Sequence, residues 1–283
     1  MSMKVHLRSV DASVSDEAQS AKIARVLAPL SNKSVASLEE LGEIPGDAPT
    51  VVRLFGRSNT QVMTWFGSNG RVASDAAVLG FCDGIIYERG ATSAPARAIS
   101  VTPAAFVSAF AAAKPHCDTS AAAIILGACD EARVIAAGLS RLGFKRLLIT
   151  DPDDKKTDHL VQVIRRRLFG IDVRAVSRAT LTQVPNECSI AVNLVGESED
   201  LFLEDVSYLN FLQKRGIWID WTGATIAKGH SDEISSAGAQ IILPDLIRAW
   251  RDVMLLEAVP GLLATTGRRP EDIAIEILKT DPS

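Results

Sequence analysis

The sequence lacks the features that mark secreted, membrane-spanning and metal-binding proteins. Its four cysteines are scattered without a Cys-x-x-Cys pair, and the first residues carry no charged-then-apolar export signal. We therefore expect a reduced, cytoplasmic setting. No apolar run approaches the roughly 18 residues that span a bilayer. The four histidines show no metal-ligand spacing, so we expect no metal site.

An excess of positive charge is missing as well. The formal net charge is −4 and the pI is near 5.7, so we expect no direct nucleic-acid binding and no attraction to anionic membranes. The basic run Arg165–Arg167 is interpreted as a solvated helix face. With 283 residues, 47% of them hydrophobic, the chain is long enough for two domains that each bury a core.

Short apolar runs alternate with helical patterns along the chain, which predicts an α/β fold with parallel sheets and crossover helices. Strands are expected at Met3–Arg8, Ser34–Ser37, Val51–Phe55, Gly84–Tyr87, Ala98–Ser100, Ala123–Leu126, Arg146–Thr150, Asp172–Ala175, Ile190–Leu194, Gly216–Asp220 and Gln240–Leu243. Helices are expected at Asp16–Ala28, Pro103–Ala113, Glu131–Leu142, Lys156–Phe169, Ser207–Arg215, Lys228–Ala237 and in a set from Pro244 to Leu278.

The most informative motif is the stretch IILGACDEAR, residues 124–133. It joins a strand, a glycine and a helix, and Asp151 ends the next strand 24 residues after Gly127. This β-α-β spacing is typical of dinucleotide binding. Such a turn needs three small positions: one for the tight turn, one where the diphosphate meets bare backbone, and one for close helix packing. Here they are Gly127, Cys129 and Ala132.

Side chains and charge occupy the place where a diphosphate would bind. Cys129 puts a side chain on the bare position, and Asp130 and Glu131 add negative charge in the first helical turn, where they can cap free N–H groups. A carboxylate 4 Å from a phosphate costs about 4 kcal/mol at an effective dielectric of 20. An ordinary N-cap role for Asp130, on a helix that meets no ligand, stays open. Asp151 would accept the ribose hydroxyls of NAD, and its charge would exclude the 2′-phosphate of NADP. We expect no cofactor, and NAD rather than NADP if one binds.

The turn resembles that of the shikimate dehydrogenase family, a Gly-Ala-Gly-Gly-Ala-Ala-Arg segment followed by an Asn-Arg-Thr clamp for NADP. The register runs without a gap from Gly127 through Arg133 to Gly143 and sets Asp151 on the clamp arginine. The resemblance extends over nearly the whole chain.

This resemblance implies a two-domain α/β architecture. It gives an N-terminal α/β substrate domain over residues 1–103, completed by C-terminal helices over 246–283. Residues 104–245 would form a Rossmann-type, doubly wound parallel sheet.

The resemblance also places the substrate-binding positions of the family. Ser13 and Ser15, in DASVSD, match the two serines that hold the carboxylate of shikimate, although a helix N-cap explains the segment equally well. Asp83 takes the place of a substrate-binding asparagine, and Arg251 that of a glutamine that contacts the substrate. Asn193, in AVNLVG, matches an asparagine near the nicotinamide.

The resemblance puts residues of other types at the two catalytic positions of the family. By this resemblance, the catalytic lysine of the family falls on Gln61, give or take one residue, with Arg57 the nearby cation. The catalytic aspartate falls on Thr102, or on Pro103 if the register shifts by one residue. Ketone reduction needs a cofactor held face-on and an acid to protonate the forming alkoxide. The resemblance therefore implies no catalytic residue.

Two functional hypotheses follow. The first is a pseudoenzyme that acts as a ligand-sensing, regulatory or partner-binding module, by analogy with the C-terminal regions of fungal quinate-pathway repressors. Arg57 and Arg251 would then help to grip a small carboxylate, and a protein partner is the other option. The second is an active NAD-dependent dehydrogenase of a shikimate-like or quinate-like hydroxy acid, with Arg57, Asp75 or Lys114 handling protons in place of the family's residues.

Overall fold

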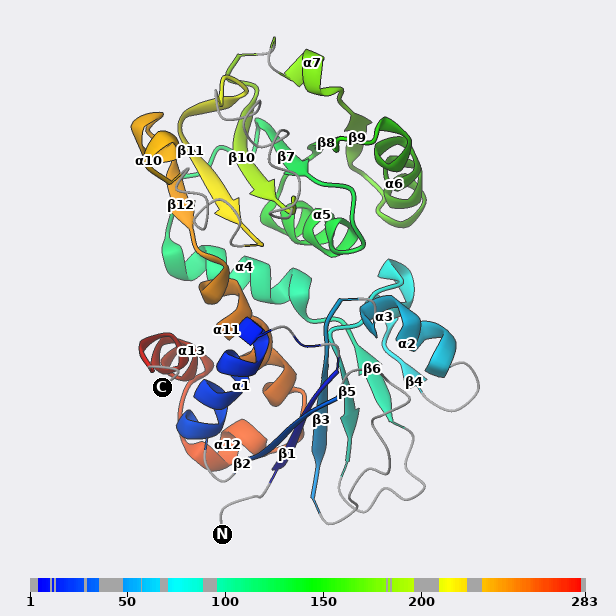
Figure 1. Ribbon diagram of the computed structural model, residues 1–283, viewed down its shortest axis with the longest axis vertical. Helices are drawn as coiled ribbons and strands as arrows, with labels where there is room; N and C mark the ends of the chain where they lie inside the picture. The colour runs from blue at the N-terminus through cyan, green and yellow to red at the C-terminus, as the bar shows by residue number, and fades with distance from the viewer. Residues whose placement is uncertain are drawn as a thin grey trace. The chain divides into compact units, whose positions relative to one another are not determined.

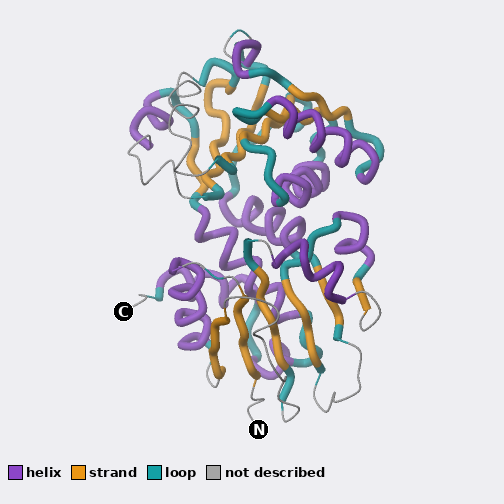
Figure 2. Tube along the Cα trace, turned by 45° about the vertical axis from the view of Figure 1, so that its right-hand side comes forward, coloured by secondary structure: helices purple, strands orange, loops and turns teal. Residues whose placement is uncertain are grey.

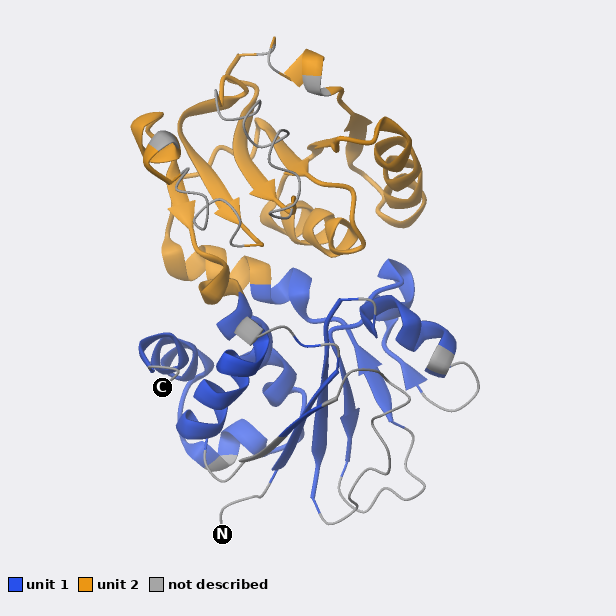
Figure 3. Cartoon of the chain, in the orientation of Figure 1, with its two compact units in different colours: residues 1–105, 248–283 blue, residues 106–247 orange. Residues whose placement is uncertain are grey.

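The computed structural model describes residues 5–10, 12, 14–27, 30–35, 48–56, 58–66, 71–88, 96–181, 183, 185–195, 209–222 and 231–280. The chain forms two compact units, shown in Figure 3. Unit 1 holds Met1–Ala105 and Arg248–Ser283, and unit 2 holds Phe106–Ile247. The divisions fall inside two helices, α4 (Thr102–Ala113) and α11 (Pro244–Glu257).

Unit 1 is built on a mixed sheet of six strands in the order β2-β1-β3-β5-β6-β4. The strands are β1 (Val5–Val10), β2 (Leu30–Val35), β3 (Thr50–Leu54), β4 (Arg71–Val72), β5 (Gly84–Tyr87) and β6 (Arg97–Ile99). Only β5 runs antiparallel to its neighbours among these described strands. Apolar side chains from β3 and β5 pack with Val62 and Phe66 in a buried core.

The helices of unit 1 are α1 (Val14–Val26), α2 (Ser58–Phe66), α3 (Ser74–Leu79), α12 (Leu262–Thr266) and α13 (Pro270–Lys279), together with the ends of α4 and α11. Helix α1 packs against α13 and β2, which brings the two ends of the chain together in one unit. Helices α2 and α3 were not expected from the sequence.

Unit 2 contains a parallel sheet of six strands in the order β12-β11-β10-β7-β8-β9 (Figure 1). Figure 2 shows the strands in orange and the helices in purple. The strands are β7 (Ala122–Leu126), β8 (Arg146–Thr150), β9 (Asp172–Ala175), β10 (Cys188–Asn193), β11 (Leu212–Asp220) and β12 (Gln240–Ile242). This is the strand order of a Rossmann sheet, whose direction of winding reverses between β7 and β10. The expected α/β class with a doubly wound parallel sheet is confirmed.

The helices of unit 2 include α5 (Glu131–Leu142), α6 (Asp154–Arg167), α7 (Arg178–Leu181) and α10 (Ser231–Ser236). Helix α6 packs on β8 and β9. Helix α5 lies close to α4, because a Cβ on Gly138 would come within 3.0 Å of the Phe106 ring. Among the helices described, none combines the length and apolar character that crossing a membrane requires.

The helix expected over Ser207–Arg215 is wrong where the structure describes it. Strand β11 starts at Leu212 and pairs in parallel with β10, with Cys188 opposite Leu212. Leu212 is buried in the same core cluster as Trp218, so sheet pairing and burial decide the conformation. The exposed charges of Lys214 and Arg215 imitate the polar face of a helix, although they lie on an irregular part of the strand.

Candidate functional site

The sequence motif around Gly127 lies at the carboxyl ends of β7 and β10, where doubly wound sheets bind ligands. Gly127 has φ of 107°, and a Cβ there would lie 3.1 Å from the main-chain carbon of Leu194. The Gly127 N–H donates to the carbonyl oxygen of Thr150 at 2.8 Å. Only glycine fits this turn, because the conformation and the close approach of Leu194 both exclude a side chain.

Asp151 holds the turn from the end of β8. Its Oδ2 accepts the Ala128 N–H at 2.7 Å, and its Oδ1 accepts the Asp153 N–H at 2.9 Å. The residue is 8% exposed. Both oxygens of the carboxylate therefore already bind backbone groups of the protein, and the first amide after Gly127 is directed at Asp151.

Asp130 stands at the N-cap position of helix α5 but does not cap it with its side chain, which speaks against the capping alternative left open by the sequence. Its backbone is already helical, its side chain makes no capping hydrogen bond, and its exposed carboxylate pairs instead with Arg133 one turn further on. A capping side chain normally reaches the free N–H groups from an extended backbone, and the helical backbone of Asp130 lacks that geometry.

The surroundings of Cys129 favour the neutral thiol over the thiolate. Burial raises its pKa well above the ordinary thiol value, and the nearby carboxylate of Glu131 raises it further. A thiol in this state is neither a nucleophile nor a metal ligand, since both roles need the thiolate. Within the described residues, no group of three potential metal ligands comes together.

A cavity of about 160 Å³ lies beside the turn. It is lined by Ala128, Cys129, Asp130 and Arg133 from the turn, and by Lys156, His159, Leu160 and Val163 from α6. Pockets for drug-sized ligands occupy roughly 300–1,000 Å³. The leading amide of the turn binds Asp151, and Cys129 and Asp130 stand on the wall of a cavity large enough for one small group.

Asn193 closes the carboxyl end of β10. Its Nδ2 donates to Asp220 Oδ1 at 3.3 Å, and its Oδ1 accepts the Val195 N–H at 3.0 Å. Asn193 and Asp220 are both fully buried. The side chain amide thus fastens the ends of β10 and β11.

In unit 1, a buried carboxylate meets the start of helix α4. Asp83 is 1% exposed, and its Oδ2 accepts the N–H groups of Val101 at 2.6 Å and Thr102 at 2.8 Å, together with the Ser100 hydroxyl at 3.2 Å. The Thr102 hydroxyl donates to the other oxygen, Oδ1. Asp83 therefore caps α4 from a neighbouring segment, satisfying N–H groups that have no partner inside the helix.

A second polar cluster in unit 1 joins β3 to α11. Arg53 is 1% exposed; its Nη2 lies 3.2 Å from Asp252 Oδ2, and its Nε lies 2.9 Å from Oδ1. The Phe55 ring faces two guanidinium groups, those of Arg53 and Arg251, each 4.8 Å from the ring centroid. Arg251 is thus positioned by cation–π contact beside a buried ion pair.

Solved structures of shikimate and quinate dehydrogenases match this chain over nearly its full length. A shikimate 5-dehydrogenase from Thermus thermophilus, in complex with NADP(H) and shikimate, gives a TM-score of 0.70 at 16% identity and covers 98% of this chain and 99% of its own. Quinate dehydrogenase from Corynebacterium glutamicum in complex with NAD gives 0.74 at 14% identity, with 99% of both chains covered.

The chain has the shikimate dehydrogenase fold. A shikimate 5-dehydrogenase from Listeria monocytogenes, in complex with shikimate and NAD, matches with a TM-score of 0.73 at 14% identity over 98% of this chain and 96% of its own. No protein-family model matches the sequence, and no curated protein matches it. The resemblance drawn from the sequence is confirmed at the level of the fold.

Two positions that the sequence placed in the cleft of a shikimate dehydrogenase fold meet in unit 1. Asp83 matches the substrate-binding asparagine of the family and Thr102 matches the catalytic aspartate, and the two residues are hydrogen-bonded to each other. Gln61, on the catalytic lysine, is exposed on α2. Ser13 and Arg57 lie outside the described residues, and only the backbone of Ser15, in α1, is described.

Three buried polar residues of unit 1 were not expected from the sequence. Arg53 and Asp252 form the ion pair described above. Asn59 donates to the carbonyl oxygens of Leu54 at 2.9 Å and Cys82 at 2.7 Å, which ties the start of α2 to the sheet. Arg53 carried a signal, since it is a charged residue within the apolar strand sequence TVVRL.

The buried thiols predict loss of stability at alkaline pH. Burial raises the pKa of Cys82 and of Cys188 to about 12, with Asp83 and Glu187 as secondary causes. An unfolded thiol has a pKa near 9, so above that pH the unfolded chain gains stability by ionising while the buried thiols stay neutral. The stability of the folded protein is therefore unaffected by these thiols below about pH 9 and falls as the pH rises towards 12. We expect about 1.4 kcal/mol lost per thiol at pH 10.

Urea unfolding at pH 7.5 and pH 10 measures this loss. A Cys82→Ala/Cys188→Ala variant serves as the control and should lose less stability between the two pH values. An equal loss in both proteins would contradict the assignment to these thiols.

Proposed function

We propose that this chain is a non-catalytic protein with a shikimate dehydrogenase fold that senses a small carboxylate ligand. The observation that carries the proposal is the bond between Asp83 and Thr102. The Asp83 carboxylate is the single carboxylate of this pair, and it accepts four hydrogen bonds from Ser100, Val101 and Thr102, at and just before the start of α4. It serves the structure of unit 1, and its oxygens are directed at the protein rather than at a ligand.

The residues at the positions of the family's catalytic lysine and aspartate cannot donate a proton. Reduction of a ketone needs an acid near the forming alkoxide, with a pKa close to the working pH. The amide of Gln61 and the hydroxyl of Thr102 do not ionise in that range. This argues for a binding role, since binding requires only hydrogen bonds and charge.

The turn around Gly127 supports the same proposal. A diphosphate is normally held by bare backbone N–H groups at the start of the helix. Here Asp151 accepts the Ala128 N–H, and the Cys129 side chain stands at the next position. We propose that the chain holds no dinucleotide.

Arg251 is the residue proposed to hold the ligand in unit 1. A guanidinium offers two parallel N–H groups that match a carboxylate. Contact with the Phe55 ring orients Arg251, and the neighbouring charge of Arg53 is already matched by Asp252. Ser13, Ser15 and Arg57 remain proposed members of this site, as expected from the sequence.

Calorimetric titration tests the proposal directly. NAD and NADP should give no saturable heat at concentrations up to about 1 mM, where even weak complexes form. Shikimate or quinate should bind to the wild-type protein and bind at least tenfold more weakly to Arg251→Ala. Arg174→Ala, which removes a surface charge from β9, is the matched control. A dissociation constant below about 1 mM for NAD or NADP, or turnover of shikimate or quinate, would refute a non-catalytic role.

The second candidate is an NAD-dependent oxidoreductase acting on a similar hydroxy acid. The small cavity beside the turn favours it, because Arg133, Lys156 and His159 gather there and provide groups for one phosphate. NAD is proposed over NADP since the Asp151 carboxylate would repel a 2′-phosphate. Steady production of NADH from quinate would support this candidate.

A further inference from the structure

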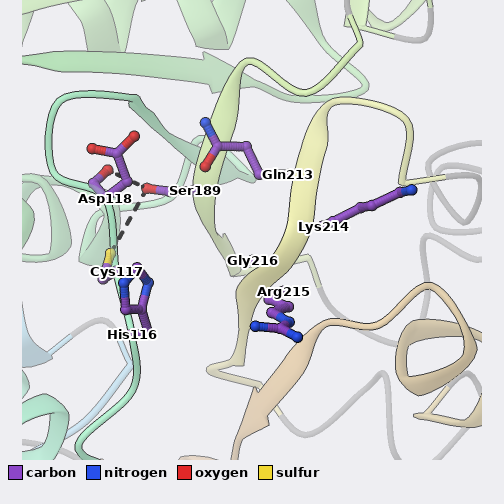
Figure 4. A pocket seen from close by; sticks show the side chains of 8 residues that line it. All are labelled: His116, Cys117, Asp118, Ser189, Gln213, Lys214, Arg215 and Gly216. Carbon is purple, nitrogen blue, oxygen red and sulfur yellow. Dashed lines mark hydrogen bonds between the residues drawn. The ribbon is translucent and has the colours of Figure 1, made fainter.

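A second, larger cavity lies at the opposite end of the parallel sheet, among the amino ends of its strands. It measures about 650 Å³, within the range of roughly 300–1,000 Å³ that ligand pockets occupy. His116, Cys117 and Asp118 line it from the segment between α4 and β7, Ser189 lines it from β10, and Gln213–Gly216 line it from β11 (Figure 4). Every one of these residues belongs to unit 2.

Two neighbouring β-bulges shape this cavity. In β10, Cys188 lies opposite Ala122 and Ile190 opposite Ala123 of β7, so Ser189 is an extra residue. Strand β11 has a longer irregularity. Leu212 pairs with Cys188 and Ile217 pairs with Ile190, so β11 advances five residues where β10 advances two. Bulges re-aim side chains and are common beside functional sites. Both bulges deliver their extra residues to the same cavity.

The wider bulge is held in an unfavourable conformation. Arg215 has φ of 64°, in the left-handed region that non-glycine residues avoid. The next residue must be glycine, since a Cβ on Gly216 would lie 2.6 Å from Leu212 Cγ. Glycine would also suit position 215 better than arginine does. Backbone strain of this kind is frequent at ligand-binding sites.

The wall opposite Arg215 is ordered and polar. The Ser189 hydroxyl donates to the Asp118 carbonyl oxygen at 2.7 Å and lies 3.7 Å from the Cys117 sulfur. The Asp118 carboxylate accepts both the N–H and the hydroxyl of Ser120, at 2.9 and 2.6 Å. Both hydrogen bonds go to Oδ1, so one oxygen of the carboxylate is held by its own loop, and the group keeps its negative charge.

The opposite side of the cavity carries the positive charges of Lys214 and Arg215. Neither Lys214 nor Arg215 forms an ion pair or side-chain hydrogen bond with another residue in the described part of the chain. Lys214 extends away from His116 and Cys117 in Figure 4, which leaves Arg215 as the principal cation. An arginine that has no ion-pair partner among the described residues, in a cavity also lined by a hydroxyl and an imidazole, suits an anion with several oxygens.

We propose that this cavity binds a small anionic metabolite through a phosphate or carboxylate group, with Arg215 as the main contact. The site is separate from the carboxylate site proposed around Arg251. It gives unit 2 a ligand site at the end of the sheet remote from Gly127.

NMR titration of the whole chain with inorganic phosphate, and separately with succinate, tests the proposal at constant ionic strength, since surface charge effects are otherwise screened unequally. At least one anion should shift the amide signals of Ser189 and Gly216 along a saturable curve. Tighter binding of phosphate would indicate a phosphate monoester as ligand, and tighter binding of succinate a carboxylate.

Arg215→Gly provides a sharp variant, because glycine keeps the left-handed backbone and relieves its strain. The melting temperature should stay equal or rise, while anion binding weakens at least tenfold. Arg166→Ala, which removes one exposed charge from α6, should leave binding unchanged. If Arg215→Gly does not fold, Arg215→Asn supplies the same test, since asparagine tolerates this conformation.

Three outcomes would overturn the proposal. The first is the absence of saturable shifts at Ser189 and Gly216 with either anion. The second is equal affinity in the wild-type protein and Arg215→Gly. The third is binding that Arg251→Ala abolishes while Arg215→Gly does not, which would assign the anion to the site in unit 1.

Discussion

Replacing Asp83 with alanine is expected to lower the free energy of unfolding by about 3 kcal/mol, because the change removes several charge-assisted hydrogen bonds and a helix cap together. The N–H groups of Val101 and Thr102 and the Thr102 hydroxyl would lose their acceptor. Thr102 is 1% exposed, so water cannot easily replace the carboxylate. Chemical denaturation at pH 7 measures the loss.

Two further variants sharpen this test. Asp83→Asn keeps one acceptor oxygen and should cost about half as much, since only the charge and one oxygen are lost. Asp158→Ala removes an exposed carboxylate from α6 and should change stability by less than about 0.5 kcal/mol. A gain in stability for Asp83→Ala would contradict the structural role, because acids retained for catalysis or ligand binding commonly reduce stability.

The regular parts of the fold could be predicted from the sequence because local patterns determine them. The strands Gly84–Tyr87, Arg146–Thr150 and Asp172–Ala175 and the helix Glu131–Leu142 have the bounds expected. Each is a short apolar run, or an amphipathic segment, ended by glycine or polar residues. Strand, turn and helix around Gly127 followed from spacing alone.

The missed elements depend on contacts that a local pattern does not contain. Helices α2 and α3 have nine and six residues, too short for a clear helical period. Asn59 holds the start of α2 through the carbonyl oxygens of Leu54 and Cys82, the latter 23 residues away. Strand β11 contains the charged bulge at Lys214–Gly216, which conceals the alternation of a strand.

The hydrogen bonds of the candidate site in unit 1 could not be predicted from the sequence. Counting from motifs placed Asp83 and Thr102 near a common site, and the structure joins them directly. That Asp83 caps α4 depends on the three-dimensional path of residues 99–102, which the sequence does not give. The roles proposed for Gln61 and Arg251 stay predictions that binding and turnover measurements decide.

The buried pair of Arg53 and Asp252 joins residues 199 positions apart, and breaking it gives the other large expected effect. Asp252→Ala should cost about 3–5 kcal/mol, the usual result of leaving one buried charge without its partner. Burial lowers the pKa of Arg53 and raises that of Asp252, which shows that desolvation opposes both charges. The pair is tolerated because each charge offsets the other.

The double variant Arg53→Met/Asp252→Leu shows whether stability is lost because one buried charge is left unpaired or because the ion pair itself is removed. The quantity compared is the free energy of unfolding. Removing both charges should restore most of the stability lost by Asp252→Ala, since apolar residues of similar volume replace buried ion pairs at little cost. Ligand binding through Arg251 should nevertheless weaken in the double variant, because Arg53, which Asp252 holds, contacts the same Phe55 ring that positions Arg251. Urea unfolding and calorimetry on the same variants measure the two effects. A double variant as unstable as Asp252→Ala would mean that the pair itself, rather than charge compensation, stabilises unit 1.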